Sequence, residues 1–309
     1  DAGPLDDAAL ARRLSYFLWR SLPDVELDEL AAGGRLSDTA TLAAQVDRML
    51  DDSKCDRFVH DFLGQWLELD RIDATTPDAQ LYPEYDDVLR SAILTETHEF
   101  FAHLIDENLS IGNLADSDFT FLNRRLAEHY GIDGVEGEAM RKVSLGRESA
   151  RGGILAHASI AKVTANGSVT TPVKRGNFVL TNLLGLPPNP PPPNVGSIEP
   201  DTRGATTIRE TLEKHQNVEA CAVCHRRIDP PGFAMECFDP IGNYRVRYRN
   251  SMGIERPATV GLRLLHKDYL LGLRVDASGT TMDGFGFDGI REFKAHLRRS
   301  SEQIARNVL

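Results

Sequence analysis

The residues most able to do chemistry lie in a five-residue run, Cys221-Ala-Val-Cys224-His225. Two thiols separated by two residues and followed at once by a histidine form the attachment sequence of a c-type haem. The thiols would form thioether bonds to the porphyrin vinyl groups, and the histidine would bind the iron from the proximal side. The run therefore predicts one covalent haem c, with His225 as a ligand of its iron.

Two thiols at this spacing also occur in a structural disulfide, in a redox pair and in half of a zinc site. A zinc site needs a second pair of Cys or His residues at comparable spacing, and a thioredoxin-type pair needs a βαβ context. The sequence shows neither. The histidine directly after the second thiol favours haem.

The sixth position of the iron stays open at this point. An electron carrier usually fills it with Met or a second His, and that choice sets the reduction potential. The methionines that follow the motif are Met235, Met252 and Met282, the last of them 57 residues beyond His225 in a loop rich in Gly and Asp. The candidates, besides an open position, are Met282, His215 and His157.

Composition limits the classes of partner and the compartment. The 309 residues are 41% hydrophobic, which is enough for a sizeable core and two domains. The 35 Lys and Arg stand against 46 Asp and Glu, and this acidic balance argues against a nucleic-acid surface. No apolar run reaches transmembrane length. Because haem c is attached outside the cytoplasmic membrane, the motif predicts a periplasmic or otherwise exported protein.

Apolar residues at helical spacing predict a mainly α fold. Over 1–130, consecutive amphipathic helices with short connections predict a helical bundle. The capping residues of these helices give their expected boundaries. The expected helices begin at Asp6 or Asp7, at Ser37 or Asp38, at Ser53 and near Pro83, and the last ends at Gly131.

Four more segments follow the bundle. Residues 131–186 form a second helical module, with a Gly-rich loop before helices near 151–163 and 173–185. A proline-rich linker, 187–205, is expected to be an extended spacer. The haem-binding segment, 206–287, contains one short β-hairpin, formed by the alternating residues around Val246 and by 273–275. Residues 288–309 begin a C-terminal helical module that we expect to be incomplete.

Several blocks of the sequence can be recognised together: Leu14–Trp19, Phe119–Gly131, Arg151–Leu155, Pro172–Gly176, the proline run, and the haem motif with Ile228–Phe233 and Phe238–Gly242. These blocks resemble the modules of planctomycete-type cytochrome c proteins, which are large exported haem proteins of environmental bacteria. The resemblance covers nearly the whole chain and implies a c-type haem and an extracytoplasmic redox role. It assigns no reaction, because the modules are of unassigned function. In such proteins a further cytochrome-like module precedes these blocks and more helix follows. Because the sequence also begins with Asp1 and not with Met, we expect it to be part of a longer chain.

Two cysteines, Cys55 and Cys237, lie outside the motif. An exported protein lies in an oxidising compartment, where an even leftover pair tends to be linked. We therefore expect a disulfide between them, which would fix the amino-terminal bundle to the haem-binding segment.

The function that these observations favour is electron transfer by a covalent haem, with a redox partner protein or a further cytochrome module. The alternative is a haem enzyme, peroxidase-like or oxidative, with an open sixth position and a substrate pocket formed by the helical modules. The chain is three times as long as the roughly 100 residues of one ordinary domain, which keeps the enzyme hypothesis open. A third possibility is an interaction scaffold in which the haem serves a bound partner.

Overall fold

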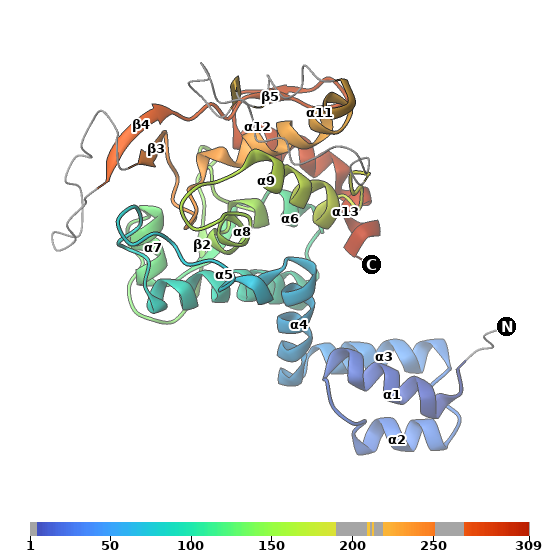
Figure 1. The fold of residues 1–309 in the computed structure, drawn as a ribbon. Helices are drawn as coiled ribbons and strands as arrows, with labels where there is room; N and C mark the ends of the chain where they lie inside the picture. The colour runs from blue at the N-terminus through green and yellow to red at the C-terminus, as the bar shows by residue number, and fades with distance from the viewer. Residues whose placement is uncertain (1–4, 190–208, 211, 213–218, 251–268, 309) are drawn as a thin grey trace. The chain divides into compact units, whose positions relative to one another are not determined.

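The computed structural model describes residues 5–189, 209–210, 212, 219–250 and 269–308, without the side chains of 219–221. In this part of the chain the fold is mainly α, as the sequence predicts (Figure 1). The chain forms two compact units. Unit 1 comprises residues 1–68 and 98–109, and unit 2 comprises residues 69–97 and 110–309. No helix in the described ranges is long and apolar enough to cross a membrane.

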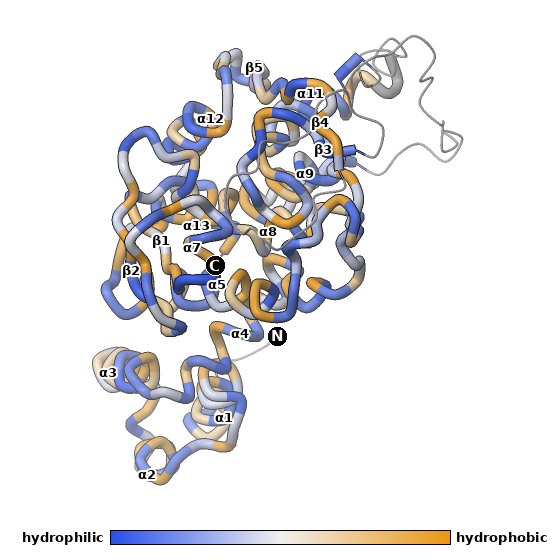
Figure 2. Tube along the Cα trace, turned by 90° about the vertical axis from the view of Figure 1, so that its left-hand side faces the viewer, coloured by the Kyte–Doolittle hydropathy of each residue, from blue (hydrophilic) through white to orange (hydrophobic). Residues whose placement is uncertain are grey.

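Unit 1 is a small helical bundle. Hydrophobic and hydrophilic residues alternate along its helices in Figure 2, as they do in helices that bury one face. Its core forms around Trp19, which is fully buried and donates a hydrogen bond from Nε1 to the Met49 carbonyl, 2.9 Å away. The elements of this unit are α1 (Asp7–Leu18), α2 (Val25–Ala32), α3 (Thr39–Leu50), the 3-10 turn η1 (Ser53–Cys55), α4 (Asp56–Trp66) and the second half of α5 (Asp87–Asp106).

Aspartate caps fix where these helices begin. The side chains of Asp6 and Asp38 accept backbone N–H groups at the starts of α1 and α3, so these two predicted boundaries are confirmed. Helix α2, capped by Asp24 in the same way, was not predicted. It has eight residues and only Leu27 of them is buried, so its sequence carries little periodicity.

Unit 2 contains the remaining helices and the strands. Before the haem motif it has η2 (Leu69–Arg71), the first half of α5, α6 (Gly112–Ala115), β1 (Phe119–Leu122), α7 (Arg124–Tyr130), β2 (Arg141–Ser144), η3 (Ile154–Ala156), α8 (Ala158–Val163), α9 (Pro172–Phe178) and the π-helical turn η4 (Val179–Leu183). It continues with α11 (Glu219–Ala234), η5 (Met235–Cys237), β3 (Arg247–Asn250), β4 (Leu270–Arg274), β5 (Gly279–Thr280), β6 (Gly286–Phe287), α12 (Ile290–Leu297), η6 (Arg298–Ser300) and α13 (Ser301–Val308).

The strands of the described residues form three two-stranded antiparallel sheets. The pair β3–β4, with Arg247 opposite Arg274, is the predicted hairpin. The pairs β1–β2 and β5–β6 were not predicted. Strand β1 is buried at all four positions, so it lacks the alternation that marks a half-exposed strand.

The compact units do not follow the predicted boundary at residue 130. Helix α5 contributes to both units, because Asp87–Thr97 packs within unit 2 and His98–Asp106 packs within unit 1. That helix also begins at Asp87 and not in the turn after Pro83, since the Asp86 carboxylate accepts the Leu89 N–H at 2.7 Å. Most of the predicted linker, residues 190–205, lies outside the described residues.

Helices α9 and α11 lie side by side and approach each other through glycines (Figure 1). A Cβ atom at Gly176 would lie 1.6 Å from the Ile228 carbonyl oxygen, and one at Gly232 would lie 1.9 Å from the Pro172 carbonyl oxygen. The two backbones are therefore in direct contact at both points. No larger residue fits at either position without moving α11, the helix that carries the haem motif.

We predict that Gly176→Ala lowers the free energy of unfolding by roughly 1–3 kcal/mol, because the overpacked methyl group forces the helices apart. This loss would exceed the gain of about 1 kcal/mol in helix propensity that alanine brings. The measurement is chemical denaturation followed by circular dichroism. Gly146→Ala is the matched control, because its Cβ would meet nothing within 4 Å. Equal stability of the two variants would contradict the proposed backbone contact.

Candidate functional site

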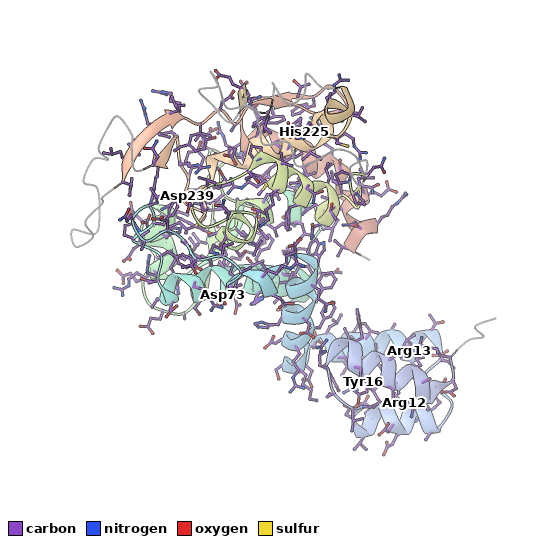
Figure 3. All side chains as sticks on the ribbon, viewed as in Figure 1. Arg12, Arg13, Tyr16, Asp73, His225 and Asp239 are labelled. Carbon is purple, nitrogen blue, oxygen red and sulfur yellow. The ribbon has the colours of Figure 1, made fainter. Side chains whose placement is uncertain are left out.

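The haem motif lies within one α-helix, α11. Cys224 lies three residues after Cys221, and His225 lies four residues after it. Residues at these spacings share a helix face. Cys224 and His225 are partly exposed, while only the backbone of Cys221 is described. The helix therefore carries the whole motif, and His225 lies near the edge of unit 2 (Figure 3).

The imidazole of His225 is oriented by a carboxylate one turn further along α11. Its Nδ1 lies 3.0 and 3.1 Å from the two carboxylate oxygens of Asp229, a residue that is only 1% exposed. A carboxylate accepts the Nδ1–H of a neutral imidazole, which places the lone pair on Nε2, the nitrogen that would bind a metal. Asp229 belongs to the haem block of the sequence, but this role was not predicted for it. Its spacing of four residues from His225 is the signal that could have assigned the role.

A cavity of about 360 Å³ lies beside this pair. Met282 also lines it, from the turn between β5 and β6, and is 67% exposed. The structure thus brings the predicted proximal ligand and one predicted sixth ligand to the same cavity. The lining residues are Arg209, His225, Arg226, Asp229, Pro230, Phe233, Gly279, Thr280, Thr281 and Met282.

Arg209 holds the β5–β6 hairpin against α11. Its guanidinium lies 3.9 Å from the centre of the Phe233 ring on α11. The same group donates to the Ser278 carbonyl oxygen at 2.6 Å and pairs with the Asp276 carboxylate at 2.6 Å. Arg209 was not identified from the sequence, since Asp276 and Ser278 lie 67 and 69 residues away along the chain.

The other candidate ligands lie elsewhere. Met235 is fully buried in η5 and His157 is buried at the start of α8, where its Nδ1 contacts the Thr97 hydroxyl at 3.1 Å. Neither residue lines the cavity at His225. His215 and Met252 lie outside the described residues.

A buried ion-pair network supports the end of α11. Glu236 is 1% exposed and lies between two arginines, with Arg175 Nη1 at 3.3 Å and Arg245 Nη2 at 3.2 Å. Arg175, on α9, also donates to the Phe238 carbonyl oxygen at 2.7 Å. Burial lowers the pKa of Arg175, and the Glu236 charge opposes that shift. The network ties α9 to the chain that leaves α11, and so it fixes the helix that presents His225.

The predicted disulfide would join residues of different units and stays a prediction. Cys55 and Cys237 are both free thiols, each buried within its own unit. Burial raises the pKa of Cys55 to about 11 and that of Cys237 to about 12, so both stay protonated. The Cys237 thiol donates to the Ala234 carbonyl within unit 2. Both residues act as small apolar side chains in separate cores.

In the part of the chain that the structure describes, no group of three or more His, Cys, Asp or Glu residues could hold a metal ion.

Two regions of the chain match known families. Residues 5–132 match PSD4, a protein family of unknown function (DUF1592), and residues 151–248 match PSCyt3, a protein family of unknown function (DUF1588). Both are modules of the planctomycete cytochrome c type. The first match ends near the predicted boundary at residue 130, and the second contains the haem motif but not Met282. No curated protein and no solved structure matches the chain.

A second titratable group that the sequence did not reveal lies deeper in unit 2. Glu96 is buried and accepts hydrogen bonds from the Tyr130 hydroxyl and, at 2.7 Å, from the Thr120 hydroxyl. Burial raises its pKa to about 7, although both hydrogen bonds and the nearby charge of Arg151 oppose the shift. Glu96 therefore changes its charge close to neutral pH, inside the core.

We predict that stability falls as the pH rises through this pKa. Between the ordinary pKa of Glu, 4.5, and about 7, the folded protein binds a proton that the unfolded chain has released, so raising the pH favours unfolding. The free energy of unfolding falls by at most about 3 kcal/mol. Glu96→Gln should remove it, so the melting temperatures of the variant and the wild type should diverge between pH 5 and pH 8. Parallel pH profiles would show that Glu96 does not titrate in the core.

Proposed function

We propose that the protein binds one haem c through Cys221 and Cys224, with His225 as the proximal ligand, and transfers electrons in an exported redox system. The observation that carries this proposal is the pairing of His225 with the buried Asp229 on the motif helix, at a cavity that Met282 also lines. Its partner is a redox protein or a further cytochrome module.

The residues present fit such a group. Asp229 holds the imidazole in one orientation and makes it a more basic ligand. Met282 brings a thioether to the same cavity, and Arg209 and Arg226 bring guanidinium groups that suit the haem propionates. When bound, the haem supplies an iron that changes its charge by one electron. The protein sets the potential of that iron through its axial ligands and their hydrogen bonds.

A haem enzyme is the second candidate, and one observation favours it. A further cavity of about 760 Å³ shares Arg209, Gly279 and Thr280 with the cavity at His225. It also shares Asp288 and Glu292 with a third cavity in unit 2. This row of cavities gives a substrate a route to the proposed haem. The exposed position of Met282 would then leave the sixth position to exchangeable ligands.

We predict that the haem stays attached when the denatured protein is extracted with acidified acetone, because thioether bonds survive unfolding. Cys221→Ala and Cys224→Ala should each leave a single thioether bond or no haem, and a pyridine haemochrome spectrum distinguishes these outcomes. Cys55→Ala, which removes a thiol outside the motif, is the control and should retain the full spectrum. Complete extraction of haem from the wild type would end the proposal.

We also predict that substitutions on the two sides of the proposed iron change its reduction potential in opposite directions. Met282→Ala should lower the reduction potential and convert low-spin iron to high-spin, because a thioether favours the ferrous state. Asp229→Asn should raise the potential, because a less basic imidazole stabilises ferric iron less well. Met235→Leu, a buried methionine away from the cavity, is the control. If Met282→Ala leaves the spectrum unchanged and the wild type binds carbon monoxide, the enzyme is the better description.

A further inference from the structure

A third cavity, of about 600 Å³, lies in unit 2 apart from the haem motif, and neither the motif nor the proposed electron transfer uses it. Its volume is in the range of small-molecule sites. Three apolar or aromatic side chains, Ile132, Tyr244 and Ile290, contribute to its walls, together with Tyr130 and Arg151. We call it the Arg151 cavity.

Arg151 is a buried cation without a matching acid. Only 6% of it is exposed, and its guanidinium lies 3.5 Å from the centre of the Tyr130 ring and 5.0 Å from that of Phe238. Nη1 donates to the Ala156 carbonyl oxygen at 2.9 Å. Within the described residues, Nη2 makes no hydrogen bond and Arg151 forms no ion pair. A buried charge in this condition is costly, and an anion beside it would offset the cost.

The neighbouring titratable groups do not supply that anion. Glu96 is occupied by the hydroxyl groups of Tyr130 and Thr120, and burial raises its pKa to about 7, so near neutral pH it is only partly charged. Burial, with a contribution from the Arg151 charge, lowers the pKa of both His129 and His157 to about 3, so both are neutral. Near neutral pH, these groups therefore balance the charge of Arg151 only in part.

The remaining cation of this region, Lys294, has acceptors of its own. Its ammonium group lies 3.2 Å from the Asp116 carboxylate and donates to the carbonyl oxygens of Arg151 and Gly152 at 2.8 and 2.7 Å. Asp116 is thus committed to Lys294.

Acidic side chains line the same cavity but are exposed. Glu148 pairs with Arg291, and Glu292 accepts the backbone N–H of Asp288. Asp288 and Glu292 have no cationic partner among the described ion pairs. The cavity therefore separates charge by depth, with a buried cation in its wall and uncompensated carboxylates toward solvent.

We propose that the Arg151 cavity binds a small amino carboxylate, with the carboxylate at Arg151 and the ammonium group at Asp288 and Glu292. A ligand with both charges complements both ends of the cavity, whereas a simple anion would be repelled by the exposed acids. An apolar body between the charges packs against Ile132, Tyr244 and Ile290. The inference does not depend on the haem.

The test is calorimetric titration of the full chain with phenylalanine and with its two single-charge analogues, 3-phenylpropionate and phenethylamine. Phenylalanine should bind more tightly than either analogue. Arg151→Met should weaken phenylalanine binding by roughly ten- to a hundredfold, the worth of one charge-assisted hydrogen bond, and leave phenethylamine unaffected. Glu292→Gln should weaken phenylalanine by a smaller factor of roughly two to five, because its carboxylate is exposed.

Two further variants keep the outcome clear. Arg12→Met removes an exposed arginine of α1 in unit 1 and should change nothing. Ala150→Trp fills the cavity while keeping Arg151, and it should abolish phenylalanine binding, which decides the matter if Arg151→Met fails to fold. The proposal is overturned if phenylalanine does not bind, if phenethylamine binds as tightly, or if either Arg151→Met or Ala150→Trp retains wild-type affinity.

Discussion

The contact between the backbones of α9 and α11 is the constraint on which the proposed haem site depends. Gly176 and Gly232 leave no room for a side chain, so the two helices meet at carbonyl oxygens and not at apolar side chains. Such a contact fixes the rotation of α11 about its own axis more strictly than side-chain packing would. That rotation decides which face of α11 carries Cys224 and His225, and therefore where a covalently attached group would lie.

The buried charges of unit 2 reinforce the same arrangement. Arg175 projects from α9 one residue before Gly176, and its guanidinium reaches Glu236 and the carbonyl oxygens just beyond α11. Removing Glu236 would leave the buried guanidinium groups of Arg175 and Arg245 without its charge, which costs more than an ion pair itself contributes. The proximal side of the proposed site is therefore rigid, from the glycine contacts through the ion pairs to the carboxylate of Asp229.

The sequence predicted what local chemistry determines. Caps at Asp6 and Asp38, the end of α7 at Gly131 and the β3–β4 pair follow from residues close to the feature that they define. What it missed depends on burial. Strand β1 is buried throughout and shows no alternation, and Arg209 acts on residues about seventy positions away.

The disulfide prediction rests on another kind of information. It used the even number of leftover cysteines and the oxidising compartment. Neither says in which core a thiol is buried, and Cys55 and Cys237 belong to different units. The haem motif differs, because all its groups lie within one helical turn. Such local information extends beyond the motif itself. Asp229, the partner of His225, lies one helical turn further along α11 and could have been identified from that spacing.

The two sides of the proposed iron differ in how firmly they are held, and this difference bears on function. His225 is fixed by a buried carboxylate on a helix that glycine contacts and ion pairs hold in place. Met282 lies exposed in a turn between two strands of two residues each, and Arg209 contacts both this hairpin and α11. A hairpin of that size has little stability of its own. Whether the sixth position holds a ligand firmly, as an electron carrier requires, or exchanges it, as an enzyme requires, therefore depends on the contacts of Arg209 more than on the identity of the methionine.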